Sequence, residues 1–189
     1  MKRIWTTGHS TRKIEIFIRL LEENGIKLVA DVRMFPGSKR YPQFGKEALV
    51  ESLGKAGIRY EHFPELGGRR KPRADSQNTA WRNESFRGYA DHMETEEFRG
   101  GIERLLAVAN HVGSTAMMCA EAVWWRCHRA LISDFLKARG VDVIHIVDLG
   151  KTEPHPFTSA ARIVNGRLRY DAGASSASLS FVENLQPES

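Results

Sequence analysis

Short apolar runs alternate along the chain with segments whose apolar residues recur at the three- and four-residue spacing of a helix. The apolar runs predict strands at residues 3–7, 26–32, 58–63, 115–119 and 141–147. The periodic segments predict helices at residues 14–24, with Ser10 or Thr11 as N-cap, and at 46–55, 85–111 (broken near Thr95) and 127–138. This alternation favours an α/β fold. We predict a three-layer, Rossmann-like domain with a mainly parallel sheet of about five strands flanked by helices.

The pattern weakens after residue 150. We predict a single α/β domain over residues 1–150 and a C-terminal extension over residues 151–189. Within the extension, Asn165-Gly166 lies between short apolar stretches and predicts a small hairpin. The last fifteen or so residues are rich in Ser and Ala, so a frayed tail is expected. A long irregular segment, from Pro64 to about Asn83, has the length of a functional or disordered loop.

The composition is that of an ordinary soluble globular protein. The chain has 189 residues, of which 41% are hydrophobic and 27% charged, enough for one domain with a substantial core. No apolar run approaches the ~20 residues that span a bilayer, so no membrane partner is expected. Two cysteines eight residues apart are not a disulfide framework, and no signal peptide is evident, which predicts a cytoplasmic location. The pattern specifies neither a cofactor nor an oligomeric state.

Polar, chemically capable residues follow every predicted strand. They are Gly8-His9-Ser10, Asp31-Val32-Arg33, His62 with Glu65, Cys119 with Glu121, and Asp148. In parallel α/β sheets, ligands bind beyond the carboxyl ends of the strands. The sequence therefore predicts one site that these strand ends share.

Residues 117–129 combine both cysteines with a glutamate, a histidine, two arginines and two adjacent tryptophans. Cys119 precedes a predicted helix N-terminus and lies near Arg126 and Arg129 in sequence, conditions that lower a cysteine pKa, sometimes to ~3.5–7.5. Cys119 is therefore a candidate nucleophile. A phosphatase- or rhodanese-type loop fits less well, because six residues separate Cys119 from Arg126 and Glu121 would oppose an anion. The competing interpretation is a buried, inert Cys119.

A second constellation offers acid/base chemistry. A carboxylate such as Glu121 or Asp31 in an apolar pocket can act as a general acid or base with a raised pKa. Asp31 and Arg33 project from one face of a strand, so a structural ion-pair network that locks the loops is the alternative. The candidate catalytic residues are therefore Cys119, Glu121, Asp31 and His9.

The net charge of +5 and pI of about 9.4 are compatible with an anionic ligand or nucleic acid, although many small soluble proteins are mildly basic. The candidate anion-binding residues are Arg33, Ser10, Ser38, Arg69, Arg70, His128 and Arg129. The basic run at residues 69–73 either closes on a phosphate or is a solvated surface loop. Trp124 and Trp125 are either a stacking platform for a base or, as we favour, a hydrophobic lid.

A metal site is the weaker interpretation of the same residues. Cys119, Cys127 and His128, with His9 or Glu121, would supply four ligands for zinc. However, the paired cysteine spacing of structural zinc sites is missing, and adjacent residues at a helix start point in different directions. We therefore predict no metal ligand and expect Cys127 to pack behind the loop.

Four groups of residues together resemble the DUF488 family. They are Thr7-Gly8-His9-Ser10, then Asp31-Val32-Arg33 with Pro36 and Ser38, then Gly57-Ile58-Arg59-Tyr60 with Leu66-Gly67-Gly68, and finally Cys119-Ala120-Glu121 with Cys127-His128-Arg129. The resemblance covers most of residues 3–150 in order, and Trp124-Trp125 does not map onto it. It implies a small bacterial or archaeal cytoplasmic α/β protein. It implies no activity, because the family is defined by its unknown function.

These observations predict an enzyme-like cleft at the strand C-termini that binds an anionic ligand, either a nucleotide or nucleic acid, and uses acid/base or thiolate chemistry. A non-catalytic nucleic-acid-binding module is the main alternative, and a metal-dependent hydrolase is a weaker one. The cluster of Cys, Glu, His and Asp favours catalysis, because phosphate binding alone needs only cations and backbone amides.

Overall fold

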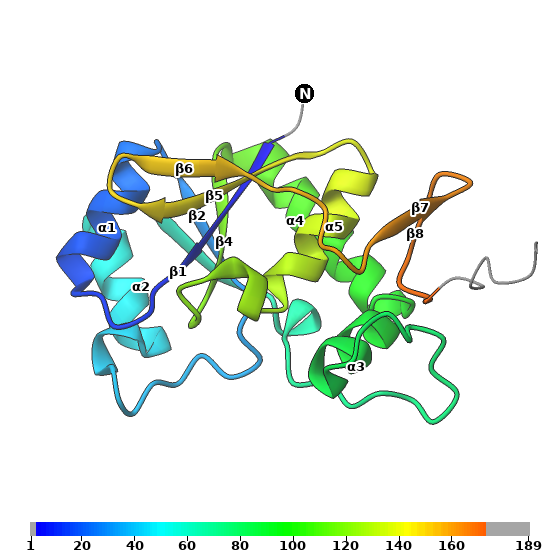
Figure 1. The fold of residues 1–189 in the computed structure, drawn as a ribbon. Coiled ribbons are helices and arrows are strands. Elements are labelled where there is room, and N and C mark those ends of the chain that lie inside the picture. Colours follow the sequence, from blue (N-terminus) through cyan, green and yellow to red (C-terminus); the bar gives the residue numbers. More distant parts are fainter. Residues whose placement is uncertain (1–2, 173–189) are drawn as a thin grey trace, which may run out of the picture.

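Six strands form the central sheet in the order β3-β2-β4-β1-β5-β6 (Figure 1). A computed structural model describes residues 3–172 of the chain. The strands are β1 (Arg3–Gly8), β2 (Leu28–Asp31), β3 (Arg59–His62), β4 (Thr115–Cys119), β5 (Asp142–Asp148) and β6 (Lys151–Pro154). The first five are parallel, and β6 pairs antiparallel with β5. The predicted α/β class and mainly parallel sheet are confirmed, with one more strand than expected.

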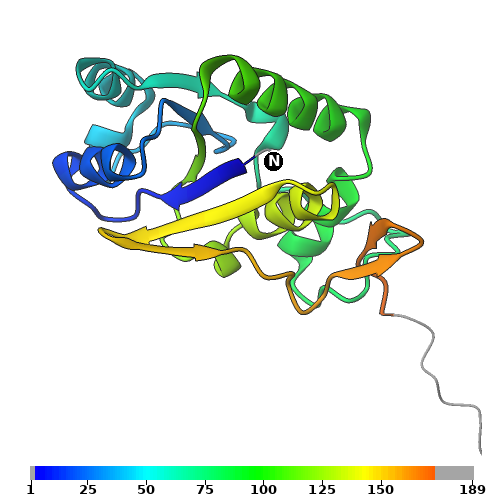
Figure 2. The same ribbon diagram turned by 90° about the horizontal axis from the view of Figure 1, so that it is seen from above.

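The α-helices within residues 3–172 are α1 (Ile14–Glu23), α2 (Lys46–Lys55), α3 (Glu84–His92), α4 (Glu96–Val112) and α5 (Arg129–Ala138). Four helices, α1, α2, α4 and α5, cover the two faces of this sheet, and α3 lies beyond its edge against α5 (Figures 1 and 2). One apolar core lies between the sheet and α1 with α2, and a second lies between the sheet and α3, α4 and α5. The alternation along β4 shows the separation, because Met118 belongs to the first core and Met117 to the second. The fold therefore has three layers.

The structure tests the predicted starts of α1, α4 and α5. The predicted N-cap for α1 was wrong, because Lys13 occupies that position and its side chain makes no capping bond. The predicted break near Thr95 is confirmed, since the Thr95 hydroxyl accepts the Phe98 N–H at 3.2 Å and starts α4. The helix predicted from Cys127 begins two residues later. A short 3₁₀ turn, η3 (Trp124–Arg126), and an extended Cys127 come before it.

Residues after β6 lie against the second core. Strands β7 (Arg162–Val164) and β8 (Arg167–Arg169) form a separate antiparallel hairpin. Its turn residues, Asn165 and Gly166, have φ values of 50° and 73°, the left-handed pair that a tight hairpin turn requires. Tyr170 then returns to the core and is 3% exposed. The frayed tail expected from the sequence lies outside the described residues.

None of the helices within residues 3–172 has the length and apolar character needed to cross a bilayer.

Candidate functional site

The carboxyl ends of β1, β2 and β4 meet at one edge of the sheet. Gly8 at the end of β1 is in register with Cys119 at the end of β4, and Asp31 at the end of β2 is in register with Met118. The chain stays paired just beyond the strands, where the His9 N–H donates to the Cys119 carbonyl at 3.0 Å. The topology therefore brings together the segments that contain His9, Asp31, Arg33 and Cys119.

Asp31 and Arg33 form a buried ion pair. Their side chains are 0% and 6% exposed, and Arg33 Nη2 lies 2.5 Å from Asp31 Oδ2. Arg33 Nε donates to both carboxylate oxygens, and the Tyr60 hydroxyl donates to Oδ2 at 2.7 Å. The remaining guanidinium nitrogen, Nη1, donates to the Phe44 carbonyl at 2.9 Å. These contacts favour the structural ion-pair interpretation over direct anion binding by Arg33.

His9 completes this network as a neutral side chain. Its ring stacks on Phe44 at 4.1 Å, and burial lowers its pKa to about 4. His9 Nδ1 lies 2.9 Å from the Ser10 carbonyl, which can only accept, so Nδ1 carries the proton and Nε2 faces Arg33 Nη1 at 3.4 Å. The imidazole is thus held between two fixed partners.

Two cysteines and a histidine form the chemically distinctive cluster of this edge. The sulfurs of Cys119 and Cys127 and one ring nitrogen of His128 all lie within 4.8 Å of one another. His128 Nδ1 lies 3.5 Å from Cys127 Sγ, and His128 Nε2 lies 2.8 Å from the Val32 carbonyl. Because a carbonyl only accepts, Nε2 carries a proton, and Nδ1 is left to interact with the sulfur. We call Cys119, Cys127 and His128 the thiol cluster.

The two thiols of the cluster differ in acidity. The hydrogen bond between the sulfurs and burial raise the pKa of Cys119 well above its ordinary value. Burial also raises the pKa of Cys127, but the Cys119 hydrogen bond and the charges of His128 and Arg129 outweigh it and hold this pKa well below the ordinary value. The surroundings of the two sulfurs therefore favour a lower pKa for Cys127 than for Cys119.

Arg129 supplies positive charge beside the thiols from the first turn of α5. Its side chain is 1% exposed; Nη2 donates to the Glu121 carbonyl at 2.6 Å, and Nη1 to the Thr6 hydroxyl at 3.1 Å. Its Nε has no partner among the described residues. A Cβ at Gly8 would lie 1.7 Å from the Glu121 carbonyl oxygen, so glycine is required there for this loop to pass. Arg129 thus fixes the loop between the two cysteines.

A buried hydrogen-bond chain continues from Arg129 through the protein. Thr6 Oγ1 lies 2.8 Å from His145 Nδ1, His145 Nε2 lies 2.9 Å from His155 Nδ1, and His155 Nε2 lies 3.0 Å from Asp134 Oδ1. Because the Asp134 carboxylate accepts, His155 Nε2 donates to it at this end of the chain. Burial, His155 and Arg129 lower the pKa of His145 to about 2, which is consistent with a neutral ring.

The tryptophan pair lies over this chain. Trp124 stacks on His145 at 4.4 Å with ring planes 5° apart, and its Nε1 donates to Glu153 at 2.6 Å. Trp125 is 53% exposed and meets Trp124 edge-on. The two tryptophans therefore differ in environment, because Trp124 packs against His145 whereas Trp125 is largely exposed.

Other candidates lie outside the thiol cluster. The Glu121 side chain is exposed and makes no hydrogen bond or ion pair within residues 3–172, whereas its backbone carbonyl accepts from Arg129. The Ser38 hydroxyl accepts the Tyr41 N–H at 3.1 Å, and Ser10 contributes its carbonyl to His9. Within the described residues, the Ser38 hydroxyl and the Ser10 carbonyl therefore make local hydrogen bonds.

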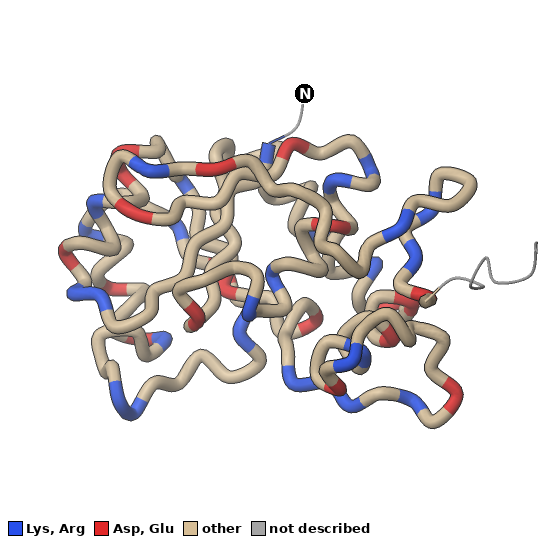
Figure 3. The backbone as a smooth tube through the Cα atoms, in the orientation of Figure 1, with Lys and Arg blue, Asp and Glu red and all other residues tan. Residues whose placement is uncertain are grey.

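The basic loop at residues 69–73 is partly neutralised. Arg70 pairs with Glu97 at 3.2 Å, and Arg73 pairs with Glu94 at 2.6 Å. In Figure 3, basic and acidic positions alternate in the part of the chain around α3. Arg69 is exposed and makes no ion pair or hydrogen bond with the rest of residues 3–172. Of the two predicted loop arginines, Arg69 is the one available to a ligand.

Sequence reasoning missed the buried chain of His145, His155 and Asp134. It considered Cys127 as a zinc ligand and expected it instead to pack behind the loop; in the structure an extended Cys127 (φ −130°, ψ 149°) separates η3 from α5. A local signal for Cys127 did exist, since a cysteine next to a histidine is a pattern of metal and thiolate sites. The two histidines of the buried chain carry no local signal, because they are ten residues apart and meet only through the pairing of β5 with the following segment.

We expect Gly68→Ala to disturb the thiol cluster selectively. A Cβ at Gly68 would lie 2.8 Å from His128 Nδ1, so the imidazole must turn away from Cys127. The midpoint of Cys127 alkylation by iodoacetamide should then shift to higher pH, while the fold loses about 1–3 kcal/mol of stability. Gly54→Ala in α2 is the control, because no atom lies within 4 Å of its added Cβ. An unchanged alkylation midpoint in Gly68→Ala would contradict the assigned role of His128.

A scan against family models matches residues 13–136 to a family described as "Domain of unknown function DUF488". The match spans about two thirds of the chain and includes the carboxyl ends of β2 and β4 together with the thiol cluster. Searches of curated proteins and of solved structures return no match.

Proposed function

The chain belongs to the DUF488 family, and we propose that it is an enzyme in which the Cys127 thiolate attacks an electrophilic carbon of an anionic substrate. The contact between Cys127 Sγ and His128 Nδ1 at 3.5 Å carries this proposal. A thiolate next to an imidazole, with the other ring nitrogen held by a fixed acceptor, is the arrangement of nucleophilic cysteine catalysis. The Val32 carbonyl is that acceptor.

Each member of the cluster has a separate task in this proposal. The Cys127 sulfur forms a bond to the substrate carbon, and the leaving group departs with its electron pair and takes a proton from His128 Nδ1. Water then attacks the same carbon and gives a proton to His128 Nδ1, and the carbon–sulfur bond breaks to release the product and restore the Cys127 thiolate. Cys119 stabilises the thiolate by a hydrogen bond, and the Arg129 charge keeps it ionised. Cys127 replaces Cys119 as candidate nucleophile, because the Cys119 pKa is raised and the Cys127 pKa is lowered.

The charge of the surroundings favours an anionic substrate. The chain has a formal net charge of +5, and Arg129 is buried beside the sulfurs. Cys127 and Cys119 are only 3% and 7% exposed. A substrate therefore reaches the sulfur only when the loop between the two cysteines, residues 120–126, moves. Arg129 holds this loop through the Glu121 carbonyl, so an anion that engages Arg129 would compete with that contact.

Alkylation kinetics test the proposal. We expect iodoacetamide to label Cys127 with a pH midpoint below that of an ordinary thiol (~8.5) and to label Cys119 more slowly, as measured by mass spectrometry of digested protein. Cys119→Ser should raise the Cys127 midpoint, and His128→Gln should raise it further. If the Cys127 midpoint is not below that of an ordinary thiol, or if Cys119 has the lower midpoint, the proposed nucleophile is wrong.

A metal site is the second candidate, because the three ligand atoms already converge. A separation of 3.5 Å between sulfur and nitrogen is close to that expected of two ligands on one tetrahedral zinc, with bonds of ~2.3 and ~2.0 Å. The Val32 carbonyl would orient the metal-binding histidine, as such partners commonly do. Elemental analysis of the protein used for alkylation separates the candidates. One equivalent of zinc that protects both cysteines and is lost in Cys119→Ser would replace the nucleophile proposal.

A further inference from the structure

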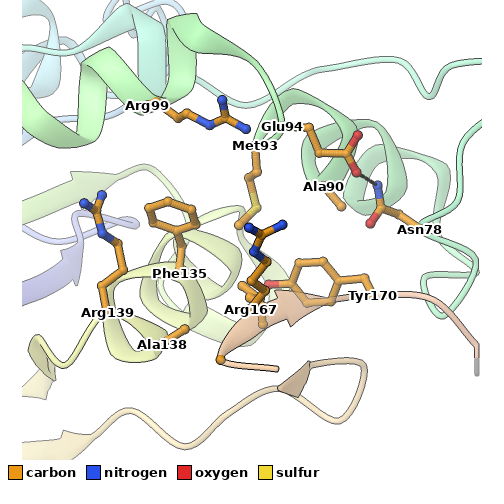
Figure 4. Close-up of a pocket in the computed structure, with 12 residues that line it drawn as sticks. Asn78, Ala90, Met93, Glu94, Arg99, Phe135, Ala138, Arg139, Arg167 and Tyr170 are labelled. Atoms are coloured by element: carbon orange, nitrogen blue, oxygen red, sulfur yellow. Dashed lines mark hydrogen bonds between the residues drawn. The ribbon is translucent and has the colours of Figure 1, made fainter. Parts of the chain in front are cut away.

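A pocket of about 300 Å³ lies away from the thiol cluster, between the ends of α3, α4 and α5 and the β7–β8 hairpin (Figure 4). None of the three thiol-cluster residues lines it. Apolar residues form the floor of the pocket, and arginines from three different elements line its walls. It therefore needs an explanation separate from the proposed reaction.

Three arginines give this pocket a positive charge. Arg99 comes from α4, Arg139 caps the end of α5, and Arg167 opens β8. The side chains of Arg139 and Arg167 make no ion pair or hydrogen bond with the rest of residues 3–172, and the Arg99 side chain pairs only with exposed Glu96 on its own helix. Three cations from separate segments that line one pocket give it a positive potential. Such a potential favours an anionic ligand.

The acidic side chain of the pocket does not cancel this charge. Glu94 lines the wall, but Arg73 donates to its Oε2 at 2.6 Å and Asn78 donates to its Oε1 at 3.0 Å. Both carboxylate oxygens are therefore engaged away from the three arginines. The hydrogen bond between Glu94 and Asn78 is drawn in Figure 4. The pocket keeps a net positive charge.

The floor of the pocket is apolar and partly aromatic. In Figure 4 the Phe135 ring lies between the Arg139 and Arg167 side chains, with Met93 behind. Arg139 lies 5.5 Å from the centre of the Phe135 ring, and the edge of Phe135 is held against Phe98 at 5.1 Å. A fixed ring beside free guanidinium groups suits a ligand with a flat group attached to an anion.

We propose that this pocket binds an organic phosphate of mononucleotide size, with its phosphate among Arg99, Arg139 and Arg167 and its base against Phe135. The volume of about 300 Å³ lies at the small end of ligand pockets, which fits one nucleotide unit. Guanidinium groups bind phosphate oxygens in pairs, so several arginines around one phosphate are chemically matched. This site is independent of the thiolate chemistry proposed above.

Binding of AMP to the full-length protein tests the proposal by calorimetry. We expect AMP to bind at a single site, adenosine to bind at least tenfold more weakly, and inorganic phosphate to compete with AMP. Arg139→Gln and Arg167→Gln should each weaken AMP binding about tenfold or more, and added salt should weaken it in the unaltered protein. Arg19→Gln, an exposed arginine of α1, is the matched control and should leave binding unchanged. Circular dichroism checks that each variant is folded.

Several outcomes would overturn this assignment. No AMP binding at millimolar concentration would remove it, as would equal binding to Arg19→Gln and to the pocket variants. A single-stranded oligonucleotide that binds far more tightly than AMP, and loses binding in the same pocket variants, would identify a nucleic acid as the occupant instead. Cys127→Ser should bind AMP normally, so a failure of the nucleophile proposal does not affect this test.

Discussion

Replacing Asp31 with alanine is expected to lower the free energy of unfolding by about 3–5 kcal/mol, one of the two largest effects that the structure predicts. The Arg33 side chain is 6% exposed and directs Nε and Nη2 at the Asp31 carboxylate. Without that carboxylate, a buried guanidinium keeps its charge but loses its counter-ion. The Tyr60 hydroxyl loses its acceptor at the same time. Urea unfolding followed by circular dichroism measures the loss.

Neighbouring variants separate the charge from the hydrogen bonds. Tyr60→Phe removes one donor to Asp31 and should cost about 1 kcal/mol, because the carboxylate keeps its other partners. Asp31→Asn keeps the shape but not the charge, so its cost should lie between the two. The double variant Asp31→Ala/Arg33→Met should recover part of the stability, because no unpaired charge remains. If Asp31→Ala costs no more than Tyr60→Phe, the ion pair does not stabilise this edge.

The alternation of apolar runs was enough to predict the layered α/β fold, but β6 could not be found in this way. Lys151–Pro154 is four residues long, is mostly exposed and contains no apolar run. It becomes a strand only because the exposed edge of β5 offers unpaired backbone groups in antiparallel register. An element whose conformation depends on its partner leaves little trace in local sequence.

At the site, too, some features were predictable from neighbouring residues in the sequence, and others depend on contacts that exist only in the folded protein. The i, i+2 spacing of Asp31 and Arg33 indicated a shared face, so their ion pair was among the alternatives that the sequence offered. The acidity order of the two cysteines was not foreseeable. It depends on where η3 ends, on the extended backbone of Cys127, and on the Val32 carbonyl that orients His128 from another strand. The acidity of the two cysteines therefore depends on contacts between residues that are far apart in the sequence.

Acidification from pH 6.5 to pH 5 is expected to cost about 3 kcal/mol of stability through two buried histidines, His9 and His145, whose pKa values are lowered to about 4 and about 2. In the unfolded chain both rings titrate near pH 6.5. Below that pH the unfolded state binds more protons than the folded state, so stability falls as the pH falls. The stability contributed by the neutral His9 and His145 rings is fully present above pH 6.5. Burial also lowers the pKa of His92, which acts in the same direction.

Single variants assign this loss to particular residues. His9→Asn and His145→Asn should each remove about half of the difference between the unfolding free energies at pH 6.5 and pH 5, whatever their stability at either pH. Exposed His111 at the end of α4 provides the control, and His111→Asn should leave the difference unchanged. The range stops at pH 5 because ordinary carboxylates titrate mainly below it. A difference that persists in both buried-histidine variants would mean that these rings are already charged in the folded protein at pH 5, which would contradict their lowered pKa values.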